Sequence, residues 1–541
     1  MNIISNKRVP VDSSITLATD VHLPAGVGPF PAILMRTPYH RVLQVNNALQ
    51  FVNRGYAFVV QDCRGKYDSD GVFKPLVNEA DDGAVTIDWV ANQKWCNGRV
   101  GLWGRSYPGM VQLPAAASSS SALCCVAPST SPANMFTDWI RHDGCFALAN
   151  MVRWLTLHTN CHTQPVTNHI NWDDIYGKNL EEIAAKTGLA TPLLAEWAKH
   201  DSYNEYWRAL DQCLLASKID IPCFHSGGWY DHITRGQFDM YARMSQSDQR
   251  LVVGPWGHMH LGARRYGIWD FGPDAELSLP ALELQFYDYY LKDLDNGYTN
   301  SPPIRLFLMG ENRWIHGQKW PLPGSTIQKW YLDSKGSANT SYGDGRLMRQ
   351  TPQLGAADSY MYDPHNPVPT QGGPVYWLLN QVGPADQRPV LNRTDILCYR
   401  SEILTERLPV VGEAMLDLTI TSNVEDTDFL ARLCVEEPNG SITVITLASL
   451  RCRYRHSWDD PQPLVPNEPT LIRLRFNQTA YVYAPGSRIV LLVTSSDFPR
   501  IKPHTNTMAS PWEKIKPQVA HNAILHGPGV TTCLSLPLAD V

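Results

Sequence analysis

Gly104-Arg105-Ser106-Tyr107-Pro108-Gly109 lies between the short apolar run 99–103 and the alanine-containing stretch 110–118. The run before it predicts a buried strand, and the stretch after it predicts a helix that Pro114 bends or interrupts. A serine on a sharp strand-to-helix turn with flanking glycines is typical of a hydrolase nucleophile, because the turn lifts the serine oxygen above the sheet. The hexapeptide therefore predicts an α/β fold with a nucleophilic serine at one end of its sheet.

Two details of this turn matter for the chemistry. The backbone N–H of Tyr107 follows the serine directly, and such a turn aims that N–H at the reacting carbonyl. Pro108 stands where the usual G-x-S-x-G pattern has its second glycine, and Gly109 comes one residue late. On these six residues alone, a tight turn with an incidental serine remains an alternative.

The rest of the first half of the chain alternates between strands and helices. Apolar runs predict strands at 31–35, 56–62, 100–103, 123–126, 221–225 and 251–254, and periodicity predicts helices at 81–91 and 279–291. Alternation of this kind is typical of a mostly parallel sheet with helices on both faces. The sequence therefore predicts the fold class α/β for this part.

Two other regions differ from this pattern. Helical patterns such as 136–140 and 180–186 replace strand-like runs over 131–217, which predicts an inserted helical domain. After residue 326, many short strands separated by turn residues predict a β-sandwich or jelly roll. A chain of 541 residues is too long for one core, so several domains are expected.

Composition excludes several classes of partner. A formal net charge of −6 gives no general attraction to nucleic acid or to anionic membranes, and no apolar run is long enough to span a bilayer. The first residues lack the apolar stretch of a secretory signal, so we expect a cytoplasmic protein. The twelve cysteines show no paired spacing and are expected to be buried free thiols.

A serine nucleophile needs a base, and the base needs an orienting carboxylate. Asp231 follows the predicted strand 221–225, and His258 follows the predicted strand 251–254. The order Ser106, Asp231, His258 is the order in which α/β-hydrolases carry these groups. Taken singly, Asp231 could instead cap a helix and His258 could be a surface histidine, while His260 could compete for the same role.

Two closely spaced pairs of histidines could in principle bind a metal ion, but neither pair favours this. His158 and His162 would share one helical face, but we expect them to line a pocket or the surface. The pair His258 and His260 has no carboxylate beside it in the sequence. We therefore expect no metal and no cofactor.

These motifs together resemble the cocaine esterase-like serine hydrolase family, which also includes X-prolyl dipeptidyl peptidases, α-amino acid ester hydrolases and glutaryl acylases. The segments that carry the resemblance are 36–39, 61–71, 95–101, 104–109, 228–231, 254–258, 426–429 and 498–500. They span nearly the whole chain. The family's pattern Gly-x-Ser-Tyr-x-Gly also accounts for Pro108, because it places the second glycine at the position of Gly109.

The resemblance implies an α/β-hydrolase core in two parts (1–130 and 218–325), a helical cap inserted at 131–217 and a C-terminal β jelly-roll domain over 326–541. It makes Ser106 the nucleophile, Asp231 the orienting acid and His258 the base. It also implies an oxyanion hole formed by the Tyr39 hydroxyl and the Tyr107 backbone N–H. A phenol suits that role because it is a directed donor that stays protonated near neutral pH.

The resemblance also bears on the substrate. Amino acid ester hydrolases bind an α-ammonium partly through an acidic pair just after the catalytic aspartate, whereas Asp231 is followed by no acid until Asp239. By resemblance to the cocaine esterase branch, Trp139, Trp154 and Ile233 would enclose an aromatic acyl group. The alternative is that both tryptophans are simply core residues of the cap.

We therefore predict a serine carboxylesterase that hydrolyses small-molecule esters, including esters with aromatic or bulky apolar acyl groups, through an acyl-enzyme. The first alternative is an amidase, an acylase or an X-prolyl dipeptidyl peptidase on the same scaffold. The second is a degenerate hydrolase whose jelly roll binds carbohydrate. The expected partner is the small-molecule ester, with no nucleic acid and no membrane, and a homo-oligomer stays open.

Overall fold

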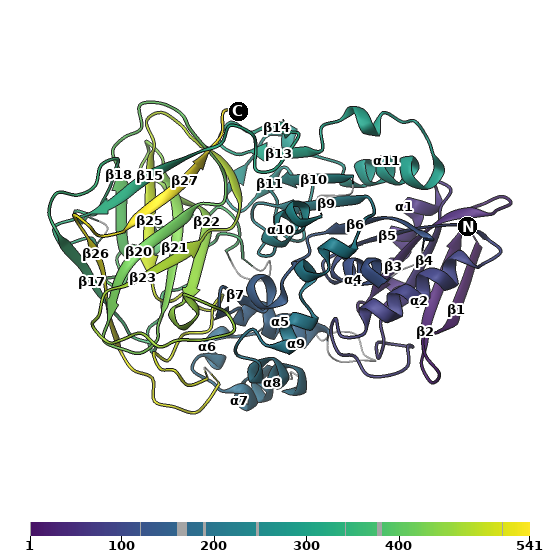
Figure 1. Ribbon diagram of the computed structural model, residues 1–541, viewed down its shortest axis with the longest axis horizontal. Helices are drawn as coiled ribbons and strands as arrows, with labels where there is room; N and C mark the ends of the chain where they lie inside the picture. The colour runs from purple at the N-terminus through teal and green to yellow at the C-terminus, as the bar shows by residue number, and fades with distance from the viewer. Residues whose placement is uncertain are drawn as a thin grey trace.

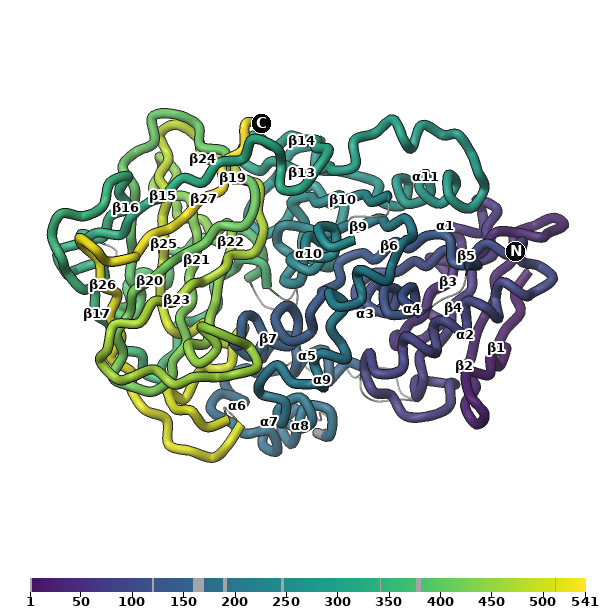
Figure 2. The backbone as a smooth tube through the Cα atoms, in the orientation of Figure 1, coloured from purple at the N-terminus to yellow at the C-terminus, as the bar shows by residue number. Residues whose placement is uncertain are grey.

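The structure is a computed structural model that describes residues 2–118, 121–158, 170–187, 191–244, 248–340, 342–375, 381–510 and 512–541. An α/β body, built by the N-terminal part of the chain, lies on one side of the molecule, and a β body, built by the C-terminal part, lies on the other (Figure 1). A helical group, α5 to α9, lies below and between them. The chain returns from α9 to the sheet at β9, as the tube in Figure 2 shows.

A mixed sheet forms the centre of the α/β body. Its strands lie in the order β1–β2–β4–β3–β5–β6–β9–β10–β13–β14. All neighbours from β4 to β13 are parallel, while β1, β2 and β14 are antiparallel at the two edges. The strands are β1 (Asn2–Pro10), β2 (Thr16–Leu23), β3 (Phe30–Thr37), β4 (Ala57–Asp62), β5 (Cys96–Arg105), β6 (Leu123–Ser129), β9 (Cys223–Gly228), β10 (Gln249–Gly254), β13 (Ile304–Leu308) and β14 (Arg313–Gly317). The predicted parallel α/β sheet is confirmed.

Helices cover both faces of this sheet. Ile33 and Phe58 pack against α1 and α11 on one face, whereas their neighbours Leu34 and Val59 pack against α2, α4 and α10 on the other. Because both faces are buried, the central strands are continuous apolar runs in the sequence. The helices of this body are α1 (Val45–Val52), α2 (Glu79–Ala91), α3 (Tyr107–Met110), α4 (Gln112–Ser118), α10 (Arg235–Arg243) and α11 (Leu279–Lys292).

The helix after Ser106 is interrupted, as predicted. It breaks between α3 and α4 at Val111, and Pro114 lies in the first turn of α4, where its missing N–H removes no hydrogen bond within α4 itself. Pro114 still leaves the Met110 carbonyl, four residues earlier, without its helical donor. Gln212 Nε2 donates to that carbonyl at 2.6 Å instead.

The helical group follows the prediction with one correction. It contains α5 (Leu148–His158), α6 (Trp172–Ile175), α7 (Leu180–Thr187), α8 (Thr191–Lys199) and α9 (Glu205–Ala209). The expectation that strands disappear from this region is wrong in detail, because β7 (Arg141–His142) and β8 (Cys145–Phe146) form a small antiparallel pair. The helix expected over 136–140 is one π-helical turn, η2 (Met135–Trp139), whose first N–H groups are capped by Asn134.

The β body is built from short strands that are almost all antiparallel, apart from the parallel pair β16 and β18. Its strands are β15 (Thr326–Asp333), β16 (Arg346–Met348), β17 (Ala356–Tyr362), β18 (Leu397–Ser401), β19 (Leu408–Gly412), β20 (Met415–Ser422), β21 (Asp428–Glu436), β22 (Ile442–Arg451), β23 (Thr470–Arg475), β24 (Thr479–Tyr483), β25 (Arg488–Thr494), β26 (Ala520–His526) and β27 (Cys533–Leu538). The predicted C-terminal β domain is confirmed. Its jelly-roll topology and the boundaries between the four segments stay predictions.

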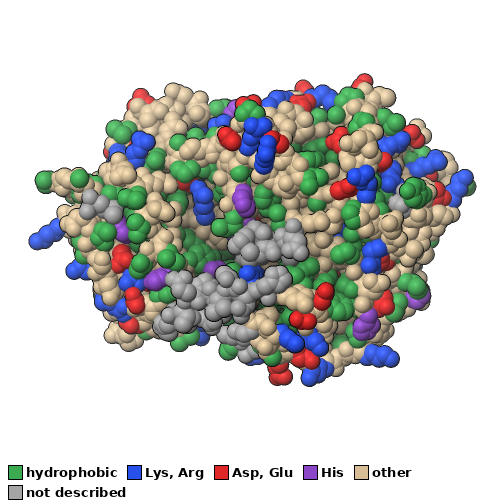
Figure 3. Space-filling model, turned by 180° about the vertical axis from the view of Figure 1, so that it is seen from behind, with side chains coloured by type: hydrophobic (Ala, Val, Ile, Leu, Met, Phe, Trp, Pro, Cys, Tyr) green, Lys and Arg blue, Asp and Glu red, His purple; other side chains and the backbone are tan. Residues whose placement is uncertain are grey.

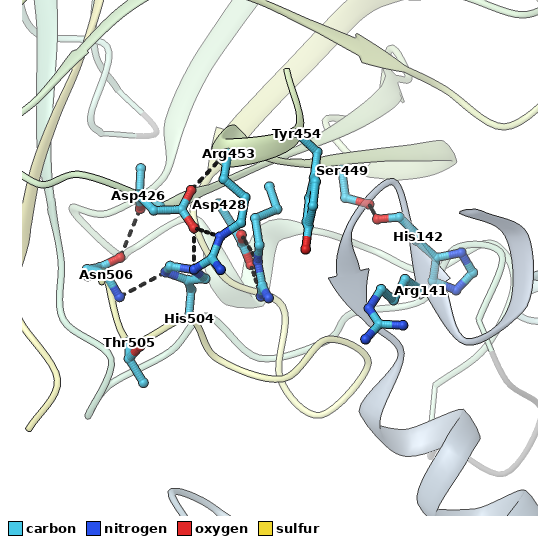
Figure 4. A network of polar contacts seen from close by, with 12 residues as sticks. Arg141, His142, Asp426, Asp428, Ser449, Arg453, Tyr454, His504, Thr505 and Asn506 are labelled. Carbon is cyan, nitrogen blue, oxygen red and sulfur yellow. Dashed lines mark hydrogen bonds and ion pairs between the residues drawn. The ribbon is translucent and has the colours of Figure 1, made fainter. Parts of the chain in front are cut away.

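A buried polar network lies where the helical group meets the β body (Figure 4). The Asp426 carboxylate accepts from Arg453 Nε at 2.5 Å and lies 3.0 Å from His504 Nε2. Ser449 Oγ donates to the His142 carbonyl at 3.0 Å and so joins the β body to the helical group. One charged contact of the network also crosses this boundary, because Arg453 Nη1 lies 3.4 Å from Asp201 Oδ2, between α8 and α9. Removing either partner would leave the other without its opposite charge.

The surface and the cysteines agree with the composition. Lys and Arg side chains alternate with Asp and Glu side chains over the face shown in Figure 3. The described cysteines are free thiols and most are buried, as expected. No described helix combines the length and the apolar character needed to cross a bilayer.

Candidate active site

A cavity of about 540 Å³ lies at the carboxyl ends of the central strands. Its walls come from the segments that follow β3, β5, β6, β9 and β10 and from helix α5. Among the residues singled out in the sequence, it is lined by Tyr39, Ser106, Trp139, Trp154, His158, Ile233 and His258. The structure thus brings together residues that lie far apart in the chain.

Ser106 sits on a strained turn directly after β5. Its backbone has φ 60° and ψ −128°, a conformation that costs a non-glycine residue about 1–3 kcal/mol. The chain packs so closely here that a Cβ at Gly104 would lie 2.4 Å from the Pro108 Cβ, and one at Gly109 would lie 2.9 Å from the Ser129 carbonyl oxygen. Both glycines are therefore needed for the turn that points Ser106 into the cavity.

Asp231 and His258 follow the neighbouring strands β9 and β10. His258 Nδ1 lies 3.1 Å from both carboxylate oxygens of Asp231, and both side chains are buried. Burial acts to raise the pKa of Asp231, but the attraction of His258 and hydrogen bonds from His232 and His258 outweigh it and lower that pKa. The carboxylate is therefore ionised and holds the imidazole by Nδ1, so that Nε2 is the nitrogen left to exchange protons.

His232 is a member of the cluster that the sequence analysis missed. Its Nδ1 lies 3.2 Å from Asp231 Oδ1, and its ring centroid lies 5.1 Å from that of His258. Burial lowers the pKa of His232, and Asp231 only partly offsets that effect. Its place next to Asp231 in the chain was the only available signal.

The donor atoms of Asp231, His232 and His258 lie within 4.8 Å of one another, so the three residues could hold a metal ion. Such an ion would have to displace the hydrogen bond between His258 Nδ1 and Asp231, because one nitrogen cannot donate to a carboxylate and bind a metal at once. The metal-bound and hydrogen-bonded arrangements therefore exclude each other.

The Tyr39 hydroxyl lies beside the nucleophile. It accepts a hydrogen bond from Trp154 Nε1 at 3.1 Å and also forms hydrogen bonds with the Ser106 side chain and the Tyr107 backbone. Burial raises the pKa of Tyr39 to about 12, although these hydrogen bonds partly offset the effect. The phenol thus stays protonated near neutral pH beside Ser106, and its role as an oxyanion donor stays a prediction.

The Tyr107 side chain anchors this turn from the opposite direction. Its hydroxyl donates to Glu79 Oε1 at 2.9 Å and accepts from the Leu76 N–H at 2.8 Å. Burial raises the pKa of Tyr107, so this hydroxyl is also a lasting donor. The residue therefore supplies its backbone to the site and its side chain to the core beneath it.

The predicted acyl-pocket residues are at once cavity wall and core. Trp139, Trp154 and Ile233 are each at most 4% exposed and all line the cavity. The two indole rings meet edge to face with centroids 5.1 Å apart, and all three residues belong to one apolar cluster with the helical group. The three residues therefore lie in the cavity wall and in the apolar core at once, and their role in enclosing an acyl group stays a prediction.

The remaining histidines differ in where they lie relative to the cavity. His158 lines the cavity with its ring centroid 4.5 Å from that of Tyr39, and burial, followed by the charge of Lys66, lowers its pKa to about 3. His260 is exposed and is not among the described residues that line the cavity. His162 lies outside the described residues.

One contact expected of a working site is not made. Within the part of the chain that the structure describes, no hydrogen bond joins Ser106 Oγ to His258, although both line the cavity. Contacts of this kind are often long without substrate and tighten when it binds. A contact between Ser106 Oγ and His258 would complete the set of groups that serine acyl transfer requires.

Comparison with known protein families gives two matches along the chain. Residues 12–260 match the X-Pro dipeptidyl-peptidase (S15 family). Residues 296–535 match the X-Pro dipeptidyl-peptidase C-terminal non-catalytic domain. The first range holds Ser106, Asp231 and His258, and the second covers most of the β body.

Individual proteins are similar over almost the whole length. Cocaine esterase of a Rhodococcus species is 32% identical over 535 residues, which cover 94% of this chain and 93% of that protein. A putative serine esterase of Mycobacterium bovis is 27% identical over 91% of this chain and 90% of its own. Among solved structures, an α-amino acid ester hydrolase superposes with a TM-score of 0.87 at 25% identity, covering 99% of this chain and 97% of that one. An aminopeptidase from a marine sediment archaeon gives 0.86 at 25% identity, covering 99% and 96%.

Proposed function

Because this chain belongs to the S15 family together with cocaine esterase, and is a serine hydrolase that acts on ester bonds, we propose that it cleaves small-molecule carboxylic esters with Ser106 as its nucleophile. One observation carries the proposal. Ser106 stands on a strained turn at the same cavity as His258, and Asp231 holds the Nδ1 of that histidine. That is the set of groups that serine acyl transfer requires.

The proposed reaction has two halves. His258 Nε2 takes the Ser106 proton as Oγ attacks the ester carbonyl, and the same proton then passes to the departing alcohol. Water next attacks the acyl-enzyme, gives a proton to His258 and releases the acid, and that proton returns to Ser106. Asp231 stays ionised throughout and stabilises the imidazolium that forms in each half.

Charge on the carbonyl oxygen is stabilised by two donors. The Tyr107 N–H is fixed by the turn, and the Tyr39 hydroxyl is held by Trp154. Since Tyr39 already accepts from the Trp154 N–H, its own proton is free to point at the developing oxyanion. Donors placed before the reaction begins lose little free energy to reorganisation.

The walls favour an uncharged substrate with an aromatic or bulky apolar acyl group. The indole rings of Trp139 and Trp154 offer flat apolar surface on which an acyl group can pack, and Ile233 adds aliphatic surface. No Asp or Glu occurs among the described residues that line the cavity, so an α-ammonium group would find no anionic partner there. This argues against amino acid esters and against peptides with a free N-terminus.

The test is Ser106→Ala assayed with p-nitrophenyl esters. We expect turnover to fall to the background rate while the fold, measured by circular dichroism, is unchanged. Activity above a few per cent of wild type would refute the assignment. Comparing an aromatic acyl ester with its matching anilide in the wild type separates the esterase from the amidase alternative.

A further inference from the structure

Among the described residues that line the cavity, Asn150 is the one whose two buried side-chain polar atoms both lack a hydrogen-bond partner, and single buried atoms of Gln50, Arg105 and Thr130 also lack one. Asn150 is 4% exposed, and neither its Oδ1 nor its Nδ2 forms a hydrogen bond with any described residue. The Thr130 hydroxyl is fully buried and is likewise unpaired within the described ranges. Both residues line the cavity. A native protein seldom leaves buried polar atoms unpaired, so each such atom calls for an explanation.

These two groups approach the cavity from different parts of the fold. Asn150 lies on α5, one turn before Trp154, and residues four apart share one face of a helix. Thr130 follows β6 directly, next to Ser129, whose carbonyl accepts the Ser106 N–H at 3.0 Å. One therefore comes from the helix that carries the aromatic wall, and the other from the sheet edge that carries the nucleophile.

The energetics point to a ligand group that completes the pairing. Leaving a buried donor or acceptor without a partner is destabilising, and an amide left wholly unpaired carries this cost at both atoms. A ligand that bonds to Asn150 removes the cost only when it is bound. Sites of this kind reject analogues that lack the matching group far more strongly than apolar pockets do.

The missing group is uncharged and both donates and accepts. An amide has a carbonyl acceptor and N–H donors, so a hydroxyl satisfies both of its atoms better than a pure donor or a pure acceptor. A buried cation on the ligand would need an opposite charge, and no Asp or Glu lines the cavity in the part of the chain that the structure describes. The nearby cation Arg105 already interacts electrostatically with the buried Glu283.

We propose that Asn150, assisted by Thr130, forms a polar subsite that recognises a hydroxyl group on the acyl part of the ester. Together with the tryptophan walls, this selects hydroxylated aromatic acyl groups of the hydroxybenzoyl type. The inference rests on the proposed esterase function and defines its substrate class more closely.

The experiment compares p-nitrophenyl esters of benzoic acid and of 2-, 3- and 4-hydroxybenzoic acid. We expect kcat/KM for one hydroxylated ester to exceed that for the benzoate by about 10-fold or more. In Asn150→Leu, which keeps the volume but removes both polar atoms, this ratio should fall to within about 2-fold of one, with the benzoate still hydrolysed. Asn47→Leu is the matched control, because Asn47 also lines the cavity but already donates to Gln44 at 2.8 Å, and its ratio should stay that of wild type.

A binding measurement keeps the subsite testable apart from turnover. Calorimetry with acetophenone and its ring-hydroxylated analogues, which carry no hydrolysable bond, should show the same preference in wild type and its loss in Asn150→Leu. A preference for the unsubstituted ring at every position, or an equal preference in wild type and Asn150→Leu, would overturn the subsite. If no ester is hydrolysed but the binding preference appears, the esterase proposal fails and the subsite stands.

Discussion

Each body contains a group of one serine, one histidine and one aspartate among its described residues. In the α/β body, Ser106 and His258 line the cavity, and Asp231 lies 3.1 Å from the Nδ1 of His258. In the β body, Ser334 Oγ donates to Asp358 Oδ1 at 2.5 Å, and His526 Nε2 lies 3.1 Å from Asp358 Oδ2. All three residues of the second cluster are buried.

The two clusters differ in how the histidine is connected. Asp231 takes Nδ1 of His258 and leaves Nε2 for the serine. In the β body the same atom, His526 Nε2, faces both Asp358 and Ser334, the latter at 3.2 Å. A single nitrogen cannot be oriented by the acid and also take a proton from the serine.

The serines differ as well. Ser106 has a positive φ and borders an open cavity, whereas the Ser334 hydroxyl is committed to Asp358 and accepts from the Gly336 N–H at 2.9 Å. The comparison shows that residue types alone do not make a catalytic site. Connectivity and access to a cavity decide which cluster can react.

The largest effect on kcat is expected from replacing Asp231, and the same replacement at Asp358 should have almost none. Asp231→Asn should lower kcat for ester hydrolysis by about 10³–10⁴-fold, because the amide would hold the wrong tautomer of His258. Asp358→Asn should leave kcat within about 2-fold of wild type when rates are normalised to folded protein. Equal losses in the two variants would contradict the distinction drawn between the clusters.

The oxyanion donor comes next. Tyr39→Phe should lower kcat by about 10²–10³-fold and leave KM nearly unchanged, because the hydroxyl acts mainly on charge that develops in the transition state. Steady-state kinetics with one aromatic ester measure both constants. A rise in KM at constant kcat would instead make Tyr39 a simple wall of the pocket.

A smaller effect is expected one step further from the chemistry. Trp154→Phe keeps an aromatic wall but removes the N–H that donates to Tyr39, so kcat should fall by about 3–10-fold. Trp139→Phe is the control, because in the described structure the Tyr39 hydroxyl accepts from the indole of Trp154 and not from that of Trp139. We expect it to alter KM more than kcat, and similar kinetic changes in both variants would remove the positioning role of Trp154.

The cluster of Ser334, Asp358 and His526 should affect the free energy of unfolding and not catalysis. Burial acts to raise the pKa of Asp358, but hydrogen bonds from His526, Ser334 and Tyr399 outweigh it and lower that pKa. A lowered pKa means that this carboxylate stabilises the fold above the ordinary range of Asp, near pH 4, and that the contribution is lost as the pH falls below it.

Asp358→Asn should therefore lower the free energy of unfolding at pH 7 by about 1–3 kcal/mol. It should also reduce the difference in that free energy between pH 7 and pH 3. Urea unfolding at the two pH values measures both effects. An unchanged pH dependence would show that the pairing in this cluster contributes nothing to stability.

The sequence predicted the site best where a catalytic residue directly follows a strand, because the order of strands and catalytic residues can be read along the chain. Ser106, Asp231 and His258 each follow a strand of a parallel sheet, and the carboxyl ends of such strands lie at one edge. The strands themselves were predictable because they are buried on both faces. Both signals are present within a few residues of chain.

Other parts of the site arise only from tertiary packing. The bond from Trp154 to Tyr39 joins residues 115 positions apart, and the contact of His232 with Asp231 depends on a side-chain orientation. Whether Asn150 has a hydrogen-bond partner depends on which residues pack around it in the folded protein, so no sequence motif could predict that it lacks one. For the same reason, the cluster around Asp358 could not be predicted, because Ser334 follows β15, Asp358 lies within β17 and His526 ends β26.

The most direct test of the central claim is to locate the reactive serine. A fluorophosphonate probe should label wild-type protein once, and peptide mass spectrometry should place the adduct on Ser106, with ester hydrolysis falling in proportion to labelling. Ser334→Ala should be labelled like wild type, and Ser106→Ala should not be labelled. An adduct on Ser334, or a fully labelled protein that still hydrolyses esters, would contradict the account.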